Sequence, residues 1–225
     1  MLTLVKTGDD KLLPYVTFVA FDLETTGLYA KKDEIIEVAG VKYTLEKKDG
    51  KISAKTIGEY SSFVKPNMFI PKEATRINKI TDQMVDDAPP AKKVLTEFIR
   101  FCGLSTVLVA HNAAFDSEFL AKTLKRNGMM IPQNPVIDSL KVSRKIMLEA
   151  PSHKLGELAK RLGNQLSLKV DEANLHRALY DCEVLKEVFT ACLRKRFQEK
   201  ELTMDKAIQS IEKVHGTALQ LKSYV

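Results

Sequence analysis

The chain has 225 residues, of which 44% are hydrophobic and 28% charged, a composition that excludes a disordered chain and predicts a globular domain with a sizeable core. Its formal net charge of +6 is compatible with a polyanionic partner, although many proteins without one are equally basic. Because charged residues interrupt the opening segment and no apolar run approaches the ~20 residues of a membrane span, we expect a soluble, cytoplasmic protein without a signal peptide.

Three strands are predicted in the first third of the chain. Residues 17–23 form a short, mostly apolar strand, and residues 34–45 and 52–64 form two longer strands joined by a turn that ends in glycine. Four prolines mark residues 66–90 as a loop region with room for a short helix. A helix follows at 91–102, where apolar side chains recur on one face.

Strands and helices alternate in the rest of the chain. The predicted elements are strands at 107–110 and 135–138 and helices at 113–126, 140–149, 154–162 and about 175–196. Three strands with short turns, followed by alternating strands and helices, predict an α/β fold with a mixed sheet flanked by helices.

Two carboxylates stand two residues apart at the end of the first predicted strand, in the segment FDLETTG at 21–27. Side chains two apart share one face of a strand, so Asp22 and Glu24 point the same way. Carboxylates this close repel each other unless a cation joins them, and paired oxygen ligands suit hard divalent cations such as Mg²⁺. Taken alone, such a segment is more often a polar strand end that enters a turn, with Gly27 at positive φ.

A third acid lies in the segment VAHNAAFDSEFL at 109–120. Asn112 is expected to cap the helix, which places Asp116 in the first turns, on the stripe that carries Phe119 and Leu120. An unpaired charge is costly on such a partly buried face, although an acid near a helix N-terminus also complements the helix dipole.

The fourth acid lies in HRALYDCEVL at 176–185. Asp181 shares the inward helical face with Ala178 and Leu185. His176 precedes Asp181 by five residues, about 140° around a helix, so the two cannot share a face. We therefore expect His176 to act from the helix entrance, although a lone histidine there is more often a surface residue.

Together these acids form a carboxylate cluster that needs counter-charge. Two divalent ions about 3.5–4 Å apart would supply it and would clamp both the attacking and the leaving oxygen of a phosphodiester. A histidine with a pKa near neutrality can take the proton of the attacking water.

The three segments resemble, in order and spacing, the motifs of the DEDDh exonucleases of the ribonuclease H-like superfamily, which include the epsilon proofreading subunit of bacterial DNA polymerase III. The matching stretches are DxETTG from Asp22, HNAxFD from His111 and HxAxxD from His176. The resemblance extends from about residue 16 to 195. It implies a ribonuclease H-like fold, with a central mixed five-stranded sheet flanked by helices.

The resemblance also assigns roles to individual residues. It implies that two Mg²⁺ or Mn²⁺ ions are bound by Asp22, Glu24, Asp116 and Asp181. His176 is then the general base. The residues implied to contact the terminal nucleotide are Thr25, Leu28, His111, Asn112 and Phe115. Asn78 stands where many relatives carry histidine, which puts in doubt how the bases near that end are contacted.

The implied activity is metal-dependent 3′→5′ hydrolysis of phosphodiester bonds, with release of nucleoside 5′-monophosphates. Similarity to the epsilon subunit favours single-stranded or mismatched DNA and a proofreading role. An RNA-trimming exoribonuclease stays open, because nothing in the sequence reads the 2′-hydroxyl. A non-catalytic nucleic-acid-binding module is a further alternative, opposed by the presence of all five residues at the implied catalytic positions. An unrelated α/β protein with solvated acids is a third.

Residues 1–197 are assigned to the exonuclease domain and residues 198–225 to a C-terminal tail. The tail is expected to contain one amphipathic helix, whose apolar stripe consists of Met204, Ala207, Ile208, Ile211 and Val214. This stripe must cover apolar surface, either on its own domain or on a partner such as a polymerase subunit.

Overall fold

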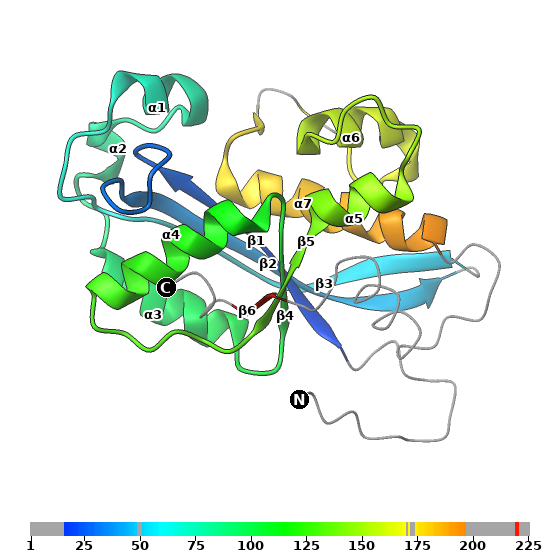
Figure 1. The fold of residues 1–225 in the computed structure, drawn as a ribbon, viewed down its shortest axis with the longest axis horizontal. Coiled ribbons are helices and arrows are strands. Elements are labelled where there is room, and N and C mark those ends of the chain that lie inside the picture. The colour runs from blue at the N-terminus through cyan, green and yellow to red at the C-terminus, as the bar shows by residue number, and fades with distance from the viewer. Residues whose placement is uncertain (1–15, 49–50, 170, 172–173, 197–218, 221–225) are drawn as a thin grey trace.

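A mixed β-sheet runs through the molecule, with helices against both faces (Figure 1). The computed structural model describes residues 16–48, 51–169, 171, 174–196 and 219–220. The strands are β1 (Thr17–Thr25), β2 (Ile35–Lys48), β3 (Lys51–Phe63), β4 (Val107–Ala110), β5 (Pro135–Asp138) and β6 (Leu219–Gln220). Their order across the sheet is β3-β2-β1-β4-β5-β6. The pairs β1–β4 and β4–β5 are parallel, and the other pairs are antiparallel.

Helices follow the strands as expected for an α/β fold. They are α1 (Lys72–Asn78), α2 (Asp82–Val85), α3 (Ala91–Cys102), α4 (Ala113–Arg126), α5 (Ser139–Ile146), α6 (Leu155–Leu162) and α7 (Ala178–Arg196), with a 3₁₀ turn η2 (Gly163–Gln165) after α6. Figure 1 shows α3 and α4 on one side of the sheet and α5, α6 and α7 on the other. None of the helices within the described ranges is both long and apolar enough to cross a membrane.

The alternation of side chains along β1 decides which helix each residue meets. Phe18 and Ala20 belong to the apolar core beneath α5, α6 and α7, whereas Val19 and Phe21 belong to the core beneath α3 and α4. Since strand side chains alternate with a period of two, residues 22 and 24 continue the Phe18 face. Asp22 and Glu24 are therefore directed to the α7 side, where the third motif lies.

The predicted five-stranded mixed sheet is confirmed, with strand boundaries that shift by no more than a few residues. The two-residue strand β6 extends it beside β5, a pairing that the sequence did not indicate. The region 66–90 holds two short helices, α1 and α2, in place of one. The amphipathic helix predicted between residues 204 and 214 lies outside the described residues, and the domain boundary near 197 stays a prediction.

Two predicted helix ends are wrong. The helix expected to reach residue 149 ends at Ile146, and the helix expected from about 175 begins at Ala178. His176 has φ 67°, in the left-handed region, so a right-handed helix cannot run through it. Helix α7 therefore starts two residues after this histidine, and His176 belongs to the preceding turn.

Gly27 is required for a different reason from the one expected. It is not among the positive-φ residues of the structure. Instead, a Cβ atom at this position would lie 2.4 Å from Asp33 Oδ2. The same oxygen accepts a hydrogen bond from the backbone N–H of Tyr29, 2.8 Å away, so Asp33 closes the loop that follows the first motif.

Replacing Gly27 by alanine should destabilise the protein by about 1–3 kcal/mol, because the methyl group displaces the Asp33 carboxylate and breaks its bond to Tyr29. Chemical denaturation of Gly27→Ala measures this loss. Gly58→Ala is the matched control, because a Cβ there would lie 3.4 Å from the Phe101 ring, an ordinary contact distance. Equal unfolding free energies for the two variants would contradict the steric explanation.

Candidate active site

Three of the predicted acids come together at the end of β1. Asp22 and Glu24 extend from this strand and Asp181 from the first turn of α7. Each of the three offers a carboxylate oxygen, and these oxygens all lie within 4.8 Å of one another. The Oδ1 atom of Asp181 is buried and has no hydrogen-bond partner among the described residues. A compact set of oxygen donors with one unpartnered atom fits a hard divalent cation.

Asp116 lies beside this trio, in the first turn of α4, and is only 4% exposed. Its charge acts on Asp22, and a hydrogen bond from the backbone of Leu23 offsets part of the rise that burial causes in the pKa of Asp116. Both interactions place Asp116 against β1. The capping role predicted for the Asn112 side chain is wrong. Asn112 stands at the N-cap position with φ 68°, but its side chain makes no capping bond. Instead its backbone N–H donates to Asp138 Oδ1 at 3.2 Å.

Burial and mutual repulsion shift the ionisation of all four acids in the same direction. Burial, followed by the charges of Asp116 and Glu24, raises the pKa of Asp22 well above its ordinary value. Burial is also the first cause for the other three, raising the pKa of Glu24 to about 8, of Asp116 to about 8 and of Asp181 to about 6. The cluster therefore resists full ionisation unless positive charge enters it.

His176 contacts the acid cluster through its backbone and lies beside the same cleft as Asp181. Its N–H donates to Asp181 Oδ2 at 3.1 Å, and its side chain is exposed. Both residues line a cleft of about 930 Å³, to which His111, Asn112 and Arg144 also contribute. The histidine thus stands at the edge of the acid cluster and outside helix α7.

The other predicted nucleotide contacts, Thr25, Leu28 and Phe115, are not among the residues that line this cleft. Leu28 is 73% exposed on the loop after β1, whereas Thr25 is buried and its hydroxyl donates to the Gly27 carbonyl at 2.6 Å. Phe115 is partly buried, with its ring 4.8 Å from that of Phe119. Of these three, Leu28 is thus the most accessible to a ligand, and the substrate contacts of all three stay predictions.

His111 is held by the protein on both sides of its ring. Its Nε2 lies 2.8 Å from the His153 carbonyl oxygen, and its Nδ1 lies 2.8 Å from the Ser139 hydroxyl. Because a carbonyl only accepts, Nε2 must carry a proton, and a neutral ring then accepts from Ser139 through Nδ1. Burial lowers the pKa of His111, which favours this neutral form. His111 therefore joins the start of α4 to α5 and to the segment around His153.

Asn78 is a buried neighbour of the first motif. Its Nδ2 donates to the Thr25 carbonyl at 3.4 Å, and its Oδ1 accepts from the Ile80 N–H at 3.0 Å. A hydrogen bond from its side chain also offsets part of the rise that burial causes in the pKa of Glu24. The side-chain amide of Asn78 is thus directed to the end of β1 that carries Asp22 and Glu24.

Sequence reasoning missed Glu37 and Arg177. Glu37 lies opposite Glu24 in the register of β1 and β2 and is only 2% exposed. Arg177 Nη2 lies 3.0 Å from Glu37 Oε1, and its Nε lies 3.4 Å from Oε2. The sequence does contain a signal that could have revealed the pair. Glu37 is a single acid within the apolar run IIEVAGV, and a buried charge is costly unless it is paired.

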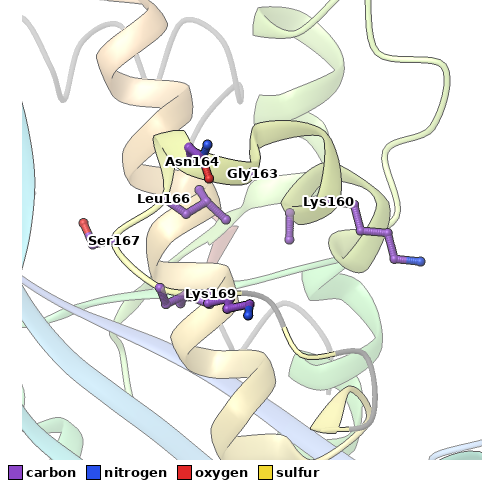
Figure 2. Close-up of a pocket in the computed structure, with 8 residues that line it drawn as sticks. Lys160, Gly163, Asn164, Leu166, Ser167 and Lys169 are labelled. Carbon is purple, nitrogen blue, oxygen red and sulfur yellow. The ribbon is translucent and has the colours of Figure 1, made fainter.

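A second cavity of about 610 Å³ lies between the end of α6, η2 and residues 166–169 (Figure 2). Its lining includes Lys160, Asn164 and Lys169 but no carboxylate among the described residues. This composition does not match the donor set that the motifs predict, so the candidate active site is the cleft beside Asp181.

The fold and the acid cluster define an exonuclease domain. The exonuclease family model named for RNase T matches residues 19–189, and the chain belongs to this family. The predicted resemblance to the DEDD-type exonucleases is thereby confirmed at the level of the family.

Two curated relatives are PolC-type DNA polymerases III. The chain is 37% identical over 185 residues to the protein of Clostridium perfringens, covering 82% of this chain and 12% of that protein. It is 39% identical over 193 residues to the protein of Staphylococcus haemolyticus, covering 86% and 12%. The chain thus spans about an eighth of the length of the curated relatives it matches.

Two solved structures show the same architecture. Exonuclease X in complex with 5′ overhanging duplex DNA has a TM-score of 0.59 at 25% identity, covering 86% of this chain and 99% of that one. E. coli exonuclease I in complex with a dT13 oligonucleotide has a TM-score of 0.66 at 18% identity, covering 81% and 42%. The ribonuclease H-like fold predicted from the motifs is confirmed.

The raised pKa values predict that stability without divalent ions falls as pH rises. The folded state holds its protons up to about pH 6–8, whereas unfolded carboxyls lose theirs near 4. Between these limits the folded state binds more protons, so unfolding becomes easier with rising pH. Melting temperatures in chelator from about pH 5 to pH 8 measure this slope.

Mg²⁺ should raise the melting temperature at pH 8 and have little effect at pH 5, since it neutralises the ionised cluster only. Na⁺ at the same ionic strength is the control, and Asp22→Asn should flatten the pH dependence. A melting temperature that ignores both pH and Mg²⁺ would contradict the cation site.

Proposed function

We propose that this domain is a metal-dependent 3′→5′ exonuclease that hydrolyses DNA from its 3′ end and releases nucleoside 5′-monophosphates. The observation that carries the proposal is the convergence of Asp22, Glu24 and Asp181, whose oxygens lie within 4.8 Å of one another. Unpaired acids packed this closely would repel a phosphodiester unless cations were present. Membership of the exonuclease family supports the same chemistry.

The four acids are the residues that would hold two Mg²⁺ or Mn²⁺ ions. Such ions supply positive charge for the phosphate and make water easier to deprotonate. Asp22 and Glu24 fix the site to the central strand β1, and Asp181 and Asp116 approach it from two helices. Because the ligands come from three elements, the site exists only in the folded chain.

His176 is the proposed general base. Its backbone N–H holds Asp181 Oδ2, while its exposed side chain lines the cleft in which substrate would lie. A neutral imidazole can accept a proton from water. The left-handed backbone of His176 takes it out of the helix, so its side chain is not tied to the helical face of Asp181.

DNA is proposed as the substrate in preference to RNA. The curated relatives are DNA polymerases by name, and both solved structures described above contain DNA by title. The same relatives also support our proposal of a proofreading role beside a polymerase. Because this chain spans 12% of their length, polymerisation itself is not transferred to it.

The direction and metal requirement can be tested on oligonucleotides labelled at the 5′ end. We expect shortening from the 3′ end, nucleoside 5′-monophosphates as products, and no activity in excess chelator. Single strands and mismatched 3′ ends should be degraded faster than matched duplexes, since a site that grips one terminal nucleotide needs it unpaired. Comparing the rates on RNA and DNA oligonucleotides of the same sequence determines which sugar the enzyme prefers. Undiminished hydrolysis in chelator would refute the mechanism.

His176→Ala and Asp181→Ala should separate base catalysis from metal binding. His176→Ala should lower kcat by about 10²–10⁴-fold, the usual contribution of a general base, and leave the Mn²⁺ concentration for half-maximal activity nearly unchanged. Asp181→Ala should raise that Mn²⁺ requirement as well as lower kcat. Steady-state rates across a Mn²⁺ titration give both quantities. A His176→Ala enzyme with more than about half the original kcat would remove the histidine from the mechanism.

A further inference from the structure

Glu37 is a buried acid that the proposed mechanism does not use. It lies on β2, in the same alternation as Ala39, Val41 and Tyr43, which pack in the core beneath α7. Its carboxylate therefore faces α7 and not solvent, and only 2% of the residue is exposed. A buried carboxylate needs compensating donors, and all of those given by the structure lie at the start of α7.

Three donors converge on this carboxylate. Arg177 approaches with two nitrogens, Nη2 at 3.0 Å from Oε1 and Nε at 3.4 Å from Oε2. The backbone N–H of Ala178, the first residue of α7, donates to Oε2 at 3.1 Å. A two-point guanidinium–carboxylate contact restricts orientation more than a single ion pair does, and the anion also satisfies a free N–H at the helix start. Glu37 thus holds the side chain of Arg177, which follows His176 directly, and the backbone amide of Ala178.

The turn that this contact restrains is the one that carries His176. His176 is exposed, lies outside the helix and has a left-handed backbone, so helical hydrogen bonds do not hold it. Asp181, in contrast, is buried in the first turn of α7, and its own N–H donates to the Arg177 carbonyl at 3.0 Å. Loosening the Glu37 contact would therefore release His176 before it displaced Asp181.

We propose that Glu37 is a positioning residue that acts through His176, by clamping Arg177 and the Ala178 amide so that the imidazole is held at the edge of the acid cluster. This inference rests on the proposed function, since it assumes that His176 takes part in hydrolysis. Glu37 itself need not touch substrate or cation.

The test is a double-mutant cycle with Glu37→Gln, His176→Ala and the double variant, measured as kcat on a single-stranded oligonucleotide at saturating Mn²⁺. Misplacement of a catalytic group by about 1 Å can cost 10²-fold, so Glu37→Gln should lower kcat by roughly 10- to 100-fold. In the His176→Ala background the same substitution should cost less than about twofold, because a positioning effect disappears with the group it positions.

Glu187→Gln is the matched control. Glu187 is also a 2% exposed glutamate on the α7 interface, where it accepts from the Ser167 N–H at 3.0 Å and pairs with Lys186 at 3.4 Å. Its loss should lower the melting temperature but leave kcat within about twofold, because it lies away from the His176 turn. If Glu37→Gln does not fold, Arg177→Lys replaces it in the cycle, since lysine keeps the charge but loses the two-point contact.

Amide hydrogen exchange gives a readout that does not depend on activity. Glu37→Gln should speed exchange at Ala178 and His176, and Glu187→Gln should not. Equal losses of kcat for Glu37→Gln in both backgrounds, or unchanged exchange at Ala178, would overturn the positioning role while leaving the exonuclease assignment intact. Failure of the unsubstituted chain to hydrolyse any 3′ end would instead overturn the proposed function and this inference with it.

Discussion

Concentration of like charge at the end of β1 is the constraint on which the rest of the structure depends. Asp22, Glu24 and Asp181 place oxygens within 4.8 Å of one another, and the charges of Asp116 and Glu37 add to their repulsion. A flexible chain would move these groups apart, so they must be held by something stronger than their repulsion. Two apolar cores, packed on opposite faces of β1, provide this restraint. The burial of Phe18 and Phe21 is thus part of how the site is built.

The start of α7 is the second place where charge decides the architecture. Two carboxylates take up the N–H groups around this point: Asp181 accepts from His176, and Glu37 accepts from Ala178. Negative charge is favoured at a helix N-terminus, so the helix can begin within an otherwise acidic site. One oxygen of Asp181 is used in this way, and the other has no partner among the described residues. The same side chain therefore organises the turn and offers a donor to the cluster.

Short-range patterns in the sequence predicted most of the architecture. The period of two along β1 places Asp22 and Glu24 on one face, and the structure confirms that they lie together with Asp181. The backbone of His176 could not be predicted in this way, because a left-handed residue is stabilised by bonds formed elsewhere in the fold. The same limit applies to Asn112, whose sequence position indicates a cap but whose N–H is taken by Asp138 from the neighbouring strand. Tertiary partners of this kind leave no periodic signal.

Glu24 and Glu37 show how the fold distinguishes two acids that begin in similar surroundings. They are cross-strand partners on the α7 face of the sheet, and like charges in such a pair destabilise it. Glu37 is compensated from within the protein by Arg177, whereas Glu24 makes no ion pair with any described lysine or arginine. The arginine that compensates Glu37 follows His176 directly in the sequence. The ion pair with Arg177 therefore neutralises Glu37, which is not a proposed cation ligand, and also anchors the turn that carries His176. The carboxylates of the acid cluster lack such a partner and must find their counter-charge outside the chain.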